Sequence, residues 1–315
     1  MKKLVVILTI VTICIGIFAT LSFAKDQLVV AFSQCDNQNN WKINETNSIK
    51  EEAQKRGIKL IYTDASADTA KQVADIEDIV SQNPDYIIIS PRVSAGLTYG
   101  LEQAKKAGIP VIIVDCASDG IPGEDFVTFI HGDFVWEGRE AAKSLARRFT
   151  GLECNIVEIV GAPASAVTAD RQKGFMDEIK KYPNMKVIAS QVGDYNRITA
   201  QKAMENIIQA HGDEIDAVFG HNDDNSIGAL MALKAAGYKP GKDVIIVGID
   251  GQKDALKAII NGEMLSTVLC SSWYGPPSFD VIEMLEKGEK VATSITNPGK
   301  LYDITNAEES LKEAF

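Results

Sequence analysis

The chain has 315 residues, with 43 acidic and 32 basic side chains and a formal net charge of −11 at pH 7. Such acidity disfavours binding to nucleic acid or to anionic membranes, so we expect neither as a partner. The length is sufficient for two domains of ordinary size.

The first 24 residues have the pattern of a secretory signal peptide. Two lysines precede an apolar run over residues 4–18, and Ser-Phe-Ala at 22–24 is typical of a cleavage site. The alternative is an uncleaved membrane anchor, because the apolar run is almost long enough to span a bilayer. Cys14 lacks the small preceding residue of a lipoprotein cysteine. This favours a freely soluble exported protein, and we expect it in the periplasm.

From Leu28 onward, short apolar runs alternate with amphipathic stretches. The predicted strands cover residues 28–32, 59–62, 86–89, 111–115, 126–130, 155–160, 186–189, 217–219, 244–250 and 266–270. The predicted helices cover residues 41–56, 70–82, 96–107, 136–149, 171–181, 198–210, 226–236, 255–260 and 279–287. This alternation is typical of parallel sheets with helices on both faces. No low-complexity linker separates two halves, so we expect two lobes joined by several crossing segments that act as a hinge.

Two of the predicted strands end in the same way. Each is an apolar run that follows a helix-stopping glycine and ends in an aspartate, Asp115 in one and Asp250 in the other. Ligands of open α/β sheets bind beyond the carboxyl ends of the strands. The alternative is that each aspartate only caps the next loop. The duplication favours a cleft in which both carboxylates hold a polyol or sugar.

Four other residues are candidates for the same cleft. Trp41 begins the first helix after a polar loop, and its ring could pack against the C–H face of a sugar or simply against the core. Asn222 could cap the helix that follows it or bind a hydroxyl. Arg171 offers five fixed donors, although most arginines are merely solvated. Tyr195 could stack on the opposite sugar face or be an ordinary loop residue.

The chain lacks the common catalytic and cofactor motifs. It has no phosphate-binding loop, no Gly-x-Gly-x-x-Gly after the first strand and no Gly-x-Ser-x-Gly nucleophile elbow. His221 is followed by Asn222 and two aspartates, but this cluster lacks the spacing of metal ligands. No histidine has an obvious catalytic partner. We therefore expect no catalytic residue, no metal, no cofactor and no enzymatic activity.

Taken together, these segments resemble the periplasmic sugar-binding proteins of ABC transporters, of the ribose- and galactofuranose-binding type. The resemblance covers residues 28–305. Its most specific segments are Phe32-Ser33-Gln34, Trp41 with Glu45-Thr46, Ile113-Val114-Asp115, Arg171-Gln172-Lys173-Gly174-Phe175, Gly193-Asp194-Tyr195-Asn196-Arg197, His221-Asn222-Asp223-Asp224 and Gly248-Ile249-Asp250-Gly251.

The resemblance implies an α/β fold with two Rossmann-like, doubly wound lobes, a three-crossing hinge and a ligand in the interlobe cleft. We assign residues 25–131 plus 252–297 to the N-terminal lobe and 132–251 plus 298–315 to the C-terminal lobe. The ligand-binding residues that the resemblance implies are Gln38, Asn40, Trp41, Lys42, Asp115, Cys116, Arg171, Tyr195, Asn222 and Asp250.

Two cysteines depart from the family pattern. Cys116 stands where the family usually has an arginine that grips the sugar, and Cys270 replaces a polar contact of the ribose-binding relatives. The pocket should therefore have lost donors, which puts both ribose and galactofuranose in doubt. We expect both cysteines to end neighbouring strands of the first lobe. There they either form a disulfide bond or shape a less polar pocket floor.

The expected function is capture of a furanose, or a related monosaccharide or polyol, for delivery to an ABC permease with its ATPase. We expect the protein to act as a monomer. The alternative is a sugar-sensing subunit that a chemoreceptor or sensor kinase reads. A repressor effector domain shares the fold, but the leader and the missing basic helix-turn-helix argue against that class.

Overall fold

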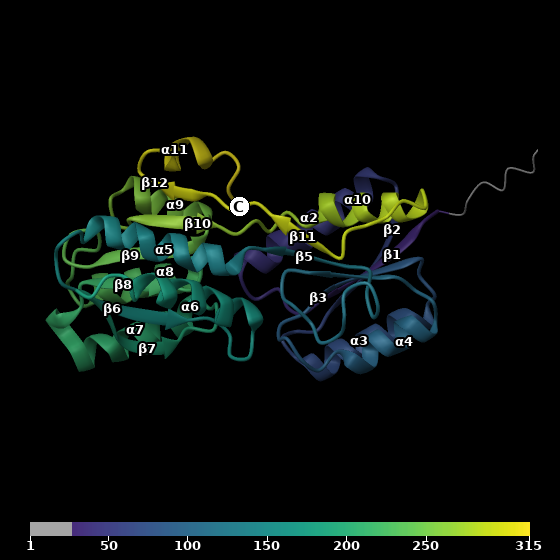
Figure 1. The fold of residues 1–315 in the computed structure, drawn as a ribbon, viewed down its shortest axis with the longest axis horizontal. Coiled ribbons are helices and arrows are strands. Elements are labelled where there is room, and N and C mark those ends of the chain that lie inside the picture. Colours follow the sequence, from purple (N-terminus) through teal and green to yellow (C-terminus); the bar gives the residue numbers. More distant parts are fainter. Residues whose placement is uncertain (1–26) are drawn as a thin grey trace, which may run out of the picture.

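The computed structural model describes residues 27–315, which form two α/β lobes side by side (Figure 1). The expected signal peptide lies outside the described residues. Each lobe is built on a six-stranded sheet. Neighbouring strands pair in parallel, apart from the antiparallel pair β10 (Ser266–Leu269) and β12 (Leu301–Asp303). Within the described part of the chain, no helix combines the length and apolar character needed to cross a membrane.

The first sheet has the strand order β11-β5-β4-β3-β1-β2. Its strands are β1 (Val29–Gln34), β2 (Lys59–Asp64), β3 (Tyr86–Ser90), β4 (Val111–Val114), β5 (Thr128–Gly132) and β11 (Ser294–Asn297). Two pairs of helices cover its opposite faces (Figure 1). The pairs are α2 (Asn40–Lys55) with α10 (Gly275–Glu286), and α3 (Thr69–Ser81) with α4 (Thr98–Lys106).

The second sheet has the strand order β12-β10-β9-β8-β6-β7. Its further strands are β6 (Cys154–Val160), β7 (Met185–Val192), β8 (Ala217–Gly220) and β9 (Ile245–Asp250). One face is covered by α5 (Phe134–Arg148) and α6 (Ala166–Ile179), and the other by α7 (Arg197–His211), α8 (Asp223–Ala235) and α9 (Lys253–Ile260). The short 3-10 helix η1 (Gly212–Glu214) follows α7, and α11 (Ala307–Ser310) packs on α9.

The central strands are apolar on both faces because helices cover both faces. In β3, Ile88 belongs to the core under α2 with Ile49, whereas Ile87 and Ile89 belong to the core under α3 with Ile76. All of these side chains are fully buried. This is the burial expected of a parallel strand. Burial of both faces also explains why the apolar runs before Asp115 and Asp250 do not alternate between polar and apolar residues.

The chain crosses between the lobes three times. The crossings lie between β5 and α5, between β10 and α10, and between β11 and β12. The assignment of residues 252–297 to the first lobe is wrong for the segment up to β10. Strand β10 pairs in parallel with β9, with Thr267 opposite Gly248, so α9 and β10 complete the second lobe. Only α10 and β11 return to the first lobe.

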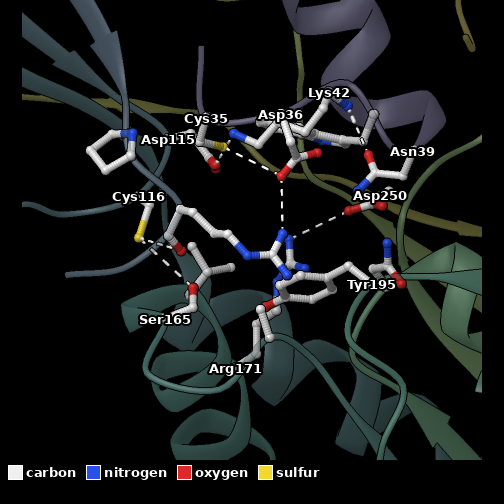
Figure 2. A pocket seen from close by; sticks show the side chains of 16 residues that line it. Cys35, Asp36, Asn39, Lys42, Asp115, Cys116, Ser165, Arg171, Tyr195 and Asp250 are labelled. Atoms are coloured by element: carbon white, nitrogen blue, oxygen red, sulfur yellow. Dashed lines mark hydrogen bonds and ion pairs between the residues drawn. The ribbon is translucent and has the colours of Figure 1, made fainter. Parts of the chain in front are cut away.

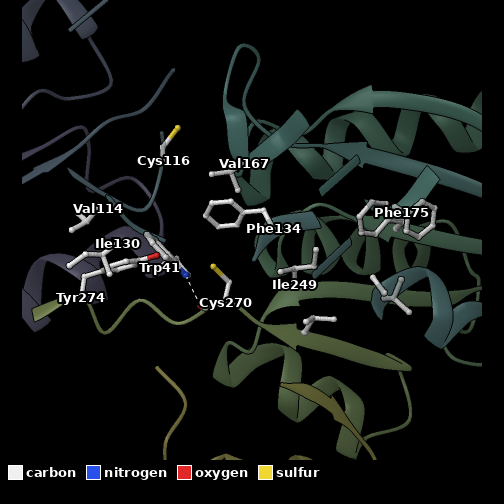
Figure 3. Close-up of a cluster of buried hydrophobic side chains, with 14 of the residues drawn as sticks. Trp41, Val114, Cys116, Ile130, Phe134, Val167, Phe175, Ile249, Cys270 and Tyr274 are labelled. Carbon is white, nitrogen blue, oxygen red and sulfur yellow. Dashed lines mark hydrogen bonds between the residues drawn. The ribbon is translucent and has the colours of Figure 1, made fainter. Parts of the chain in front are cut away.

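All three tryptophans of the chain lie in the crossing segments or contact them. Trp41 Nε1 donates a 2.9 Å hydrogen bond to the backbone oxygen of Cys270, at the start of the second crossing (Figure 3). Trp273 lies in that crossing and is 45% exposed. The ring of Trp136 lies against Gly299 in the third crossing, where an added Cβ would come within 2.3 Å of a ring carbon.

Candidate functional site

A pocket of about 510 Å³, including the part open to solvent, lies between the lobes where the carboxyl ends of both sets of strands meet (Figure 2). The loops after β1, β3 and β4 and the start of α2 supply its first-lobe wall. The loops after β6, β7 and β8, together with α6 and the end of β9, supply the opposite wall. The lining residues are Cys35, Asp36, Asn39, Trp41, Lys42, Pro91, Arg92, Asp115, Cys116, Ala162, Ser165, Val167, Arg171, Tyr195, Asn222 and Asp250.

The structure brings eight of the ten predicted site residues together in this pocket. They are Trp41, Lys42, Asp115, Cys116, Arg171, Tyr195, Asn222 and Asp250. The other two, Gln38 and Asn40, have exposed side chains and do not line it. Asn39 takes their place, since it caps α2 by accepting a 2.9 Å hydrogen bond from the backbone nitrogen of Lys42. Asn40 is the first residue of the helix and faces solvent instead.

Lys42 is a buried cation at the first-lobe wall. Its Nζ donates to Asp115 Oδ2 at 2.9 Å, to Glu45 Oε2 at 3.0 Å and to Ser90 Oγ at 2.7 Å. Burial alone would lower the pKa of Lys42, but the charges of Asp115 and Glu45 outweigh it and raise that pKa well above its usual value. Lys42 is therefore charged, and it fixes the position of the Asp115 carboxylate.

Both strand-ending aspartates have a positive φ. Asp115 has φ 64° and Asp250 has φ 135°, a region that non-glycine residues rarely adopt. Such strain persists only where the surrounding structure enforces it, and it is concentrated at functional sites. The repeated aspartate of the sequence is thus also a repeated backbone feature that turns each carboxylate into the pocket.

Two glycines determine where Arg171 lies. Helices α5 and α6 pack closely, and an added Cβ at Gly138 would lie 2.0 Å from the backbone oxygen of Arg171. At Gly174 it would lie 1.9 Å from the backbone oxygen of Val135. Only glycine permits this approach.

The expectation that a helix begins at Arg171 is wrong, because α6 begins at Ala166 and Arg171 lies in its second turn.

The Arg171 guanidinium is buried and held by three contacts. Its Nε donates to Glu137 Oε2 at 2.9 Å, its Nη1 to the backbone oxygen of His221 at 2.7 Å, and its Nη2 lies 3.5 Å from Asp250 Oδ1. Burial opposes its charge, but Glu137 in particular raises the pKa of Arg171 well above its usual value. The contact with Asp250 joins two of the predicted site residues directly.

Tyr195 and Asn222 are held by their own lobe. The Tyr195 hydroxyl lies 2.7 Å from Thr168 Oγ1, and burial raises the pKa of this phenol, so it stays protonated. Asn222 accepts a 2.9 Å hydrogen bond from the backbone nitrogen of Asn225 and caps α8. Because Asn222 also lines the pocket, capping and ligand contact are compatible rather than exclusive.

The sequence reasoning missed two charged residues of the wall, Asp36 and Arg92. Arg92 Nη1 lies 3.0 Å from Asp36 Oδ2, and Nη2 lies 2.9 Å from Asp194 Oδ1. Each lies two residues beyond the end of a strand, Asp36 after β1 and Arg92 after β3. Asp115 follows β4 directly, so both missed residues lie one position farther from a strand end than the aspartate that the sequence pattern identified.

The expectations for the cysteines are partly wrong. Cys35, Cys116, Cys154 and Cys270 are all buried free thiols. Cys270 does not end a strand of the first lobe, because it follows β10 of the second lobe, and it does not line the pocket. The thiols in the pocket wall are those of Cys35 and Cys116. Cys116 Sγ lies 3.8 Å from Ser165 Oγ of the other lobe.

The charges of the pocket wall are balanced. Asp36, Asp115 and Asp250 face Lys42, Arg92 and Arg171, three carboxylates against three cations. Each cation is already paired with a carboxylate. No group of three or more His, Cys, Asp or Glu side chains within residues 27–315 could hold a metal ion. The pocket wall therefore offers many hydrogen-bond donors and acceptors but no unpaired charge. This combination suits an uncharged ligand with several hydroxyls.

The protein-family model that describes the periplasmic binding protein domain matches residues 30–274 of the chain. The chain belongs to this family. It is 37% identical to the galactofuranose-binding protein YtfQ of Escherichia coli (strain K12), over 91% of each chain. It is 32% identical to the ribose import binding protein RbsB of Bacillus subtilis (strain 168), over 88% of each chain.

A solved structure confirms the two-lobe fold. The periplasmic binding protein of the arabinose ABC transporter from Shewanella sp. ANA-3, bound to α- and β-L-arabinofuranose, superposes with a TM-score of 0.87. It is 36% identical, and the match covers 90% of this chain and 95% of that one. The relatives carry the names of binding proteins and not of enzymes, in agreement with the interpretation of the sequence.

Proposed function

We propose that the protein is a substrate-binding protein that captures an uncharged furanose, or a related monosaccharide or polyol, for an ABC importer. The observation that carries the proposal is the interlobe pocket, in which every cation is already paired with a carboxylate and a tryptophan ring forms part of the wall. The names of the relatives, which bind galactofuranose, ribose and arabinofuranose, support the same ligand class.

Each polar wall residue has a role that follows from its chemistry. Asp115 and Asp250 accept hydrogen bonds from ligand hydroxyls, and Arg171 and Asn222 donate to ligand oxygens. The ring of Trp41 packs on an apolar C–H face of the ligand. Because the first-lobe and second-lobe groups face one another, a ligand contacts both sets at once only when the lobes are closed. Binding therefore shifts the population toward the closed form.

Three further residues complete the proposed site. Tyr195 presents its ring to the ligand while its hydroxyl is bonded to Thr168. Lys42 acts mainly through the Asp115 carboxylate that it holds. Cys116 supplies a small, weakly polar surface at the end of β4.

The partners follow from the proposed role. The closed monomer would dock on a membrane permease with its ATPase, in the periplasm, after removal of the proposed signal peptide. An alternative role is that of a sensing subunit read by a chemoreceptor or sensor kinase. Deletion of the gene separates the two roles. A transport protein is required for ligand uptake, whereas a sensing subunit is required for chemotaxis or ligand-induced transcription but not for uptake.

A thermal-shift screen against pentoses, hexoses, furanoses and polyols tests the ligand class. A ligand that binds only the folded protein adds about 2.7 kcal/mol to the free energy of unfolding at 100 times its dissociation constant. We expect at least one uncharged sugar or polyol to raise the Tm, and uronic acids and sugar phosphates to leave it unchanged. A panel in which only charged amino acids or peptides shift the Tm would contradict the proposal.

A further inference from the structure

Arg92 joins carboxylates from both lobes across the mouth of the cleft. Its guanidinium lies 3.0 Å from Asp36 of its own lobe and 2.9 Å from Asp194 of the second lobe. Asp36 is only 2% exposed and lies in the loop after β1. The contact with Asp36 therefore holds the guanidinium in place on the first lobe. The contact with Asp194 ties it to the second lobe.

Asp194 is itself fixed to the second lobe. It lies in the turn between β7 and α7, where Asp194 has φ 56° and Tyr195 has φ 54°. The backbone nitrogen of Asp194 donates to the Val160 oxygen at 3.2 Å, and Tyr195 is bonded to Thr168. Two consecutive left-handed residues store strain that the surrounding structure must hold. The turn thus presents the Asp194 carboxylate toward the first lobe in one defined position.

Other contacts lie in the same seam. The backbone nitrogen of Ser94 donates to the oxygen of Ala164 at 3.3 Å, and Cys116 Sγ lies 3.8 Å from Ser165 Oγ. These contacts join the loops after β3 and β4 to the loop after β6. None of their residues belongs to a crossing segment, so chain connectivity does not impose them. They exist only while the lobes are closed.

We infer that Arg92 is a positioning residue that latches the two lobes through Asp194, independently of which ligand fills the pocket. Since Arg92 also lines the pocket, the latch must open whenever ligand enters or leaves. The ion pair is partly exposed, with 22% of the Arg92 side chain and 37% of the Asp194 side chain accessible. An ion pair of this kind changes an equilibrium by about two- to fivefold, and salt screens it.

Cys116 provides an internal probe of opening that needs no ligand. Cys116 is only 1% exposed, and its thiol faces Ser165 of the other lobe. Burial raises the pKa of this thiol. Alkylation of Cys116 therefore requires separation of the lobes. When opening and closing are fast, the labelling rate follows the open population. Cys154 is the internal reference, because it is fully buried in β6 and lies away from the seam.

The test compares labelling rates of the ligand-free protein by iodoacetamide, resolved by peptide mass analysis. We expect Asp194→Asn, which keeps the side-chain size, and Arg92→Ala to raise the Cys116 rate about two- to fivefold, with no further rise in the double variant. High salt should raise the rate in the wild-type protein but not in Asp194→Asn. Arg147→Ala removes the same charge from an exposed position of α5 and should change nothing.

Two outcomes would overturn the latch. One is a wild-type Cys116 rate in Asp194→Asn. The other is a rise at Cys154 in step with Cys116, which would mean that the substitution loosens the whole fold. No ligand is used, so failure of the latch is distinct from failure of the proposed ligand class.

Discussion

Asp250 is a pocket carboxyl group whose ionised form the fold disfavours. It is 2% exposed, and burial raises its pKa well above the usual value even though the Arg171 guanidinium opposes that shift. A carboxyl whose pKa is higher in the folded than in the unfolded state lowers the free energy of unfolding once it is ionised. Asp250→Asn keeps the size and removes the charge. We therefore expect the ligand-free variant to be at least as stable as the wild-type protein at pH 7.

The same change should weaken ligand binding. Asp250 Oδ1 faces Arg171 at 3.5 Å and Oδ2 faces Gln252 Nε2 at 3.2 Å, so the carboxylate is oriented by donors on both sides. A hydrogen bond from a ligand hydroxyl to a charged acceptor contributes about 1.5–3 kcal/mol. Asparagine offers a single neutral acceptor in its place. We expect the dissociation constant to rise by about 10- to 150-fold.

Titration calorimetry with the ligand from the screen, together with urea unfolding without ligand, measures both effects. The matched control is Asp254→Asn. Asp254 also pairs with an arginine of the second lobe, Arg197 at 3.1 Å, but its side chain is 44% exposed and lies outside the pocket. The control should bind within about twofold of the wild-type protein. Wild-type affinity in Asp250→Asn would refute the role given to this carboxylate, and a loss of ligand-free stability would refute the electrostatic argument.

Two further predictions concern the second lobe. Burial raises the pKa of Asp223 to about 7. Between about pH 4 and 7 the folded state therefore retains a proton that the unfolded state releases, and stability falls as the pH rises. Asp223→Asn should remove this part of the pH dependence in urea unfolding, and an unchanged slope would contradict the assignment. Gly174→Ala would place a Cβ 1.9 Å from the Val135 oxygen and should lower the stability by about 1–3 kcal/mol and weaken ligand binding. Lys173→Ala, on an exposed position of the same helix, should do neither, and equal behaviour of the two variants would argue against the close packing.

The central strands were predictable from sequence because their environment is uniform. A strand with helices on both faces must be apolar throughout, and runs such as 86–89 and 244–250 satisfy this condition. The edge strands β11 and β12 and helix α11 were missed. Strand β11 alternates between exposed and half-buried residues and contains only one large apolar side chain, Ile295. Such a segment acquires its structure from its neighbour β5, and nothing local marks it.

The boundary between the lobes was not predictable for a related reason. Whether β10 pairs with a strand of the first or the second sheet depends on contacts between residues far apart in sequence. Its four residues, Ser266–Leu269, would suit either sheet. The misplacement of Cys270 follows from this one error. Strand pairing is non-local, and a single sequence carries little information about it.

The pocket was predictable where a residue type and a strand end coincide, as at Asp115 and Asp250. Asn39 was missed because the resemblance implied its neighbours Gln38 and Asn40, whereas Asn39 is the loop residue that caps α2 and lines the pocket. Arg92 was missed because an arginine in a loop is usually solvated. Only the structure shows that carboxylates of two lobes meet it.

The placement of the tryptophans has a spectroscopic consequence. Each of the three indoles contacts or belongs to a crossing segment, and the first of them also lines the pocket. The emission of a tryptophan depends on the polarity and the quenching groups around its ring, and here those surroundings include the crossing segments. The intrinsic fluorescence of the unlabelled protein should therefore change when the hinge moves. No indole elsewhere in either lobe contributes a constant background to that signal.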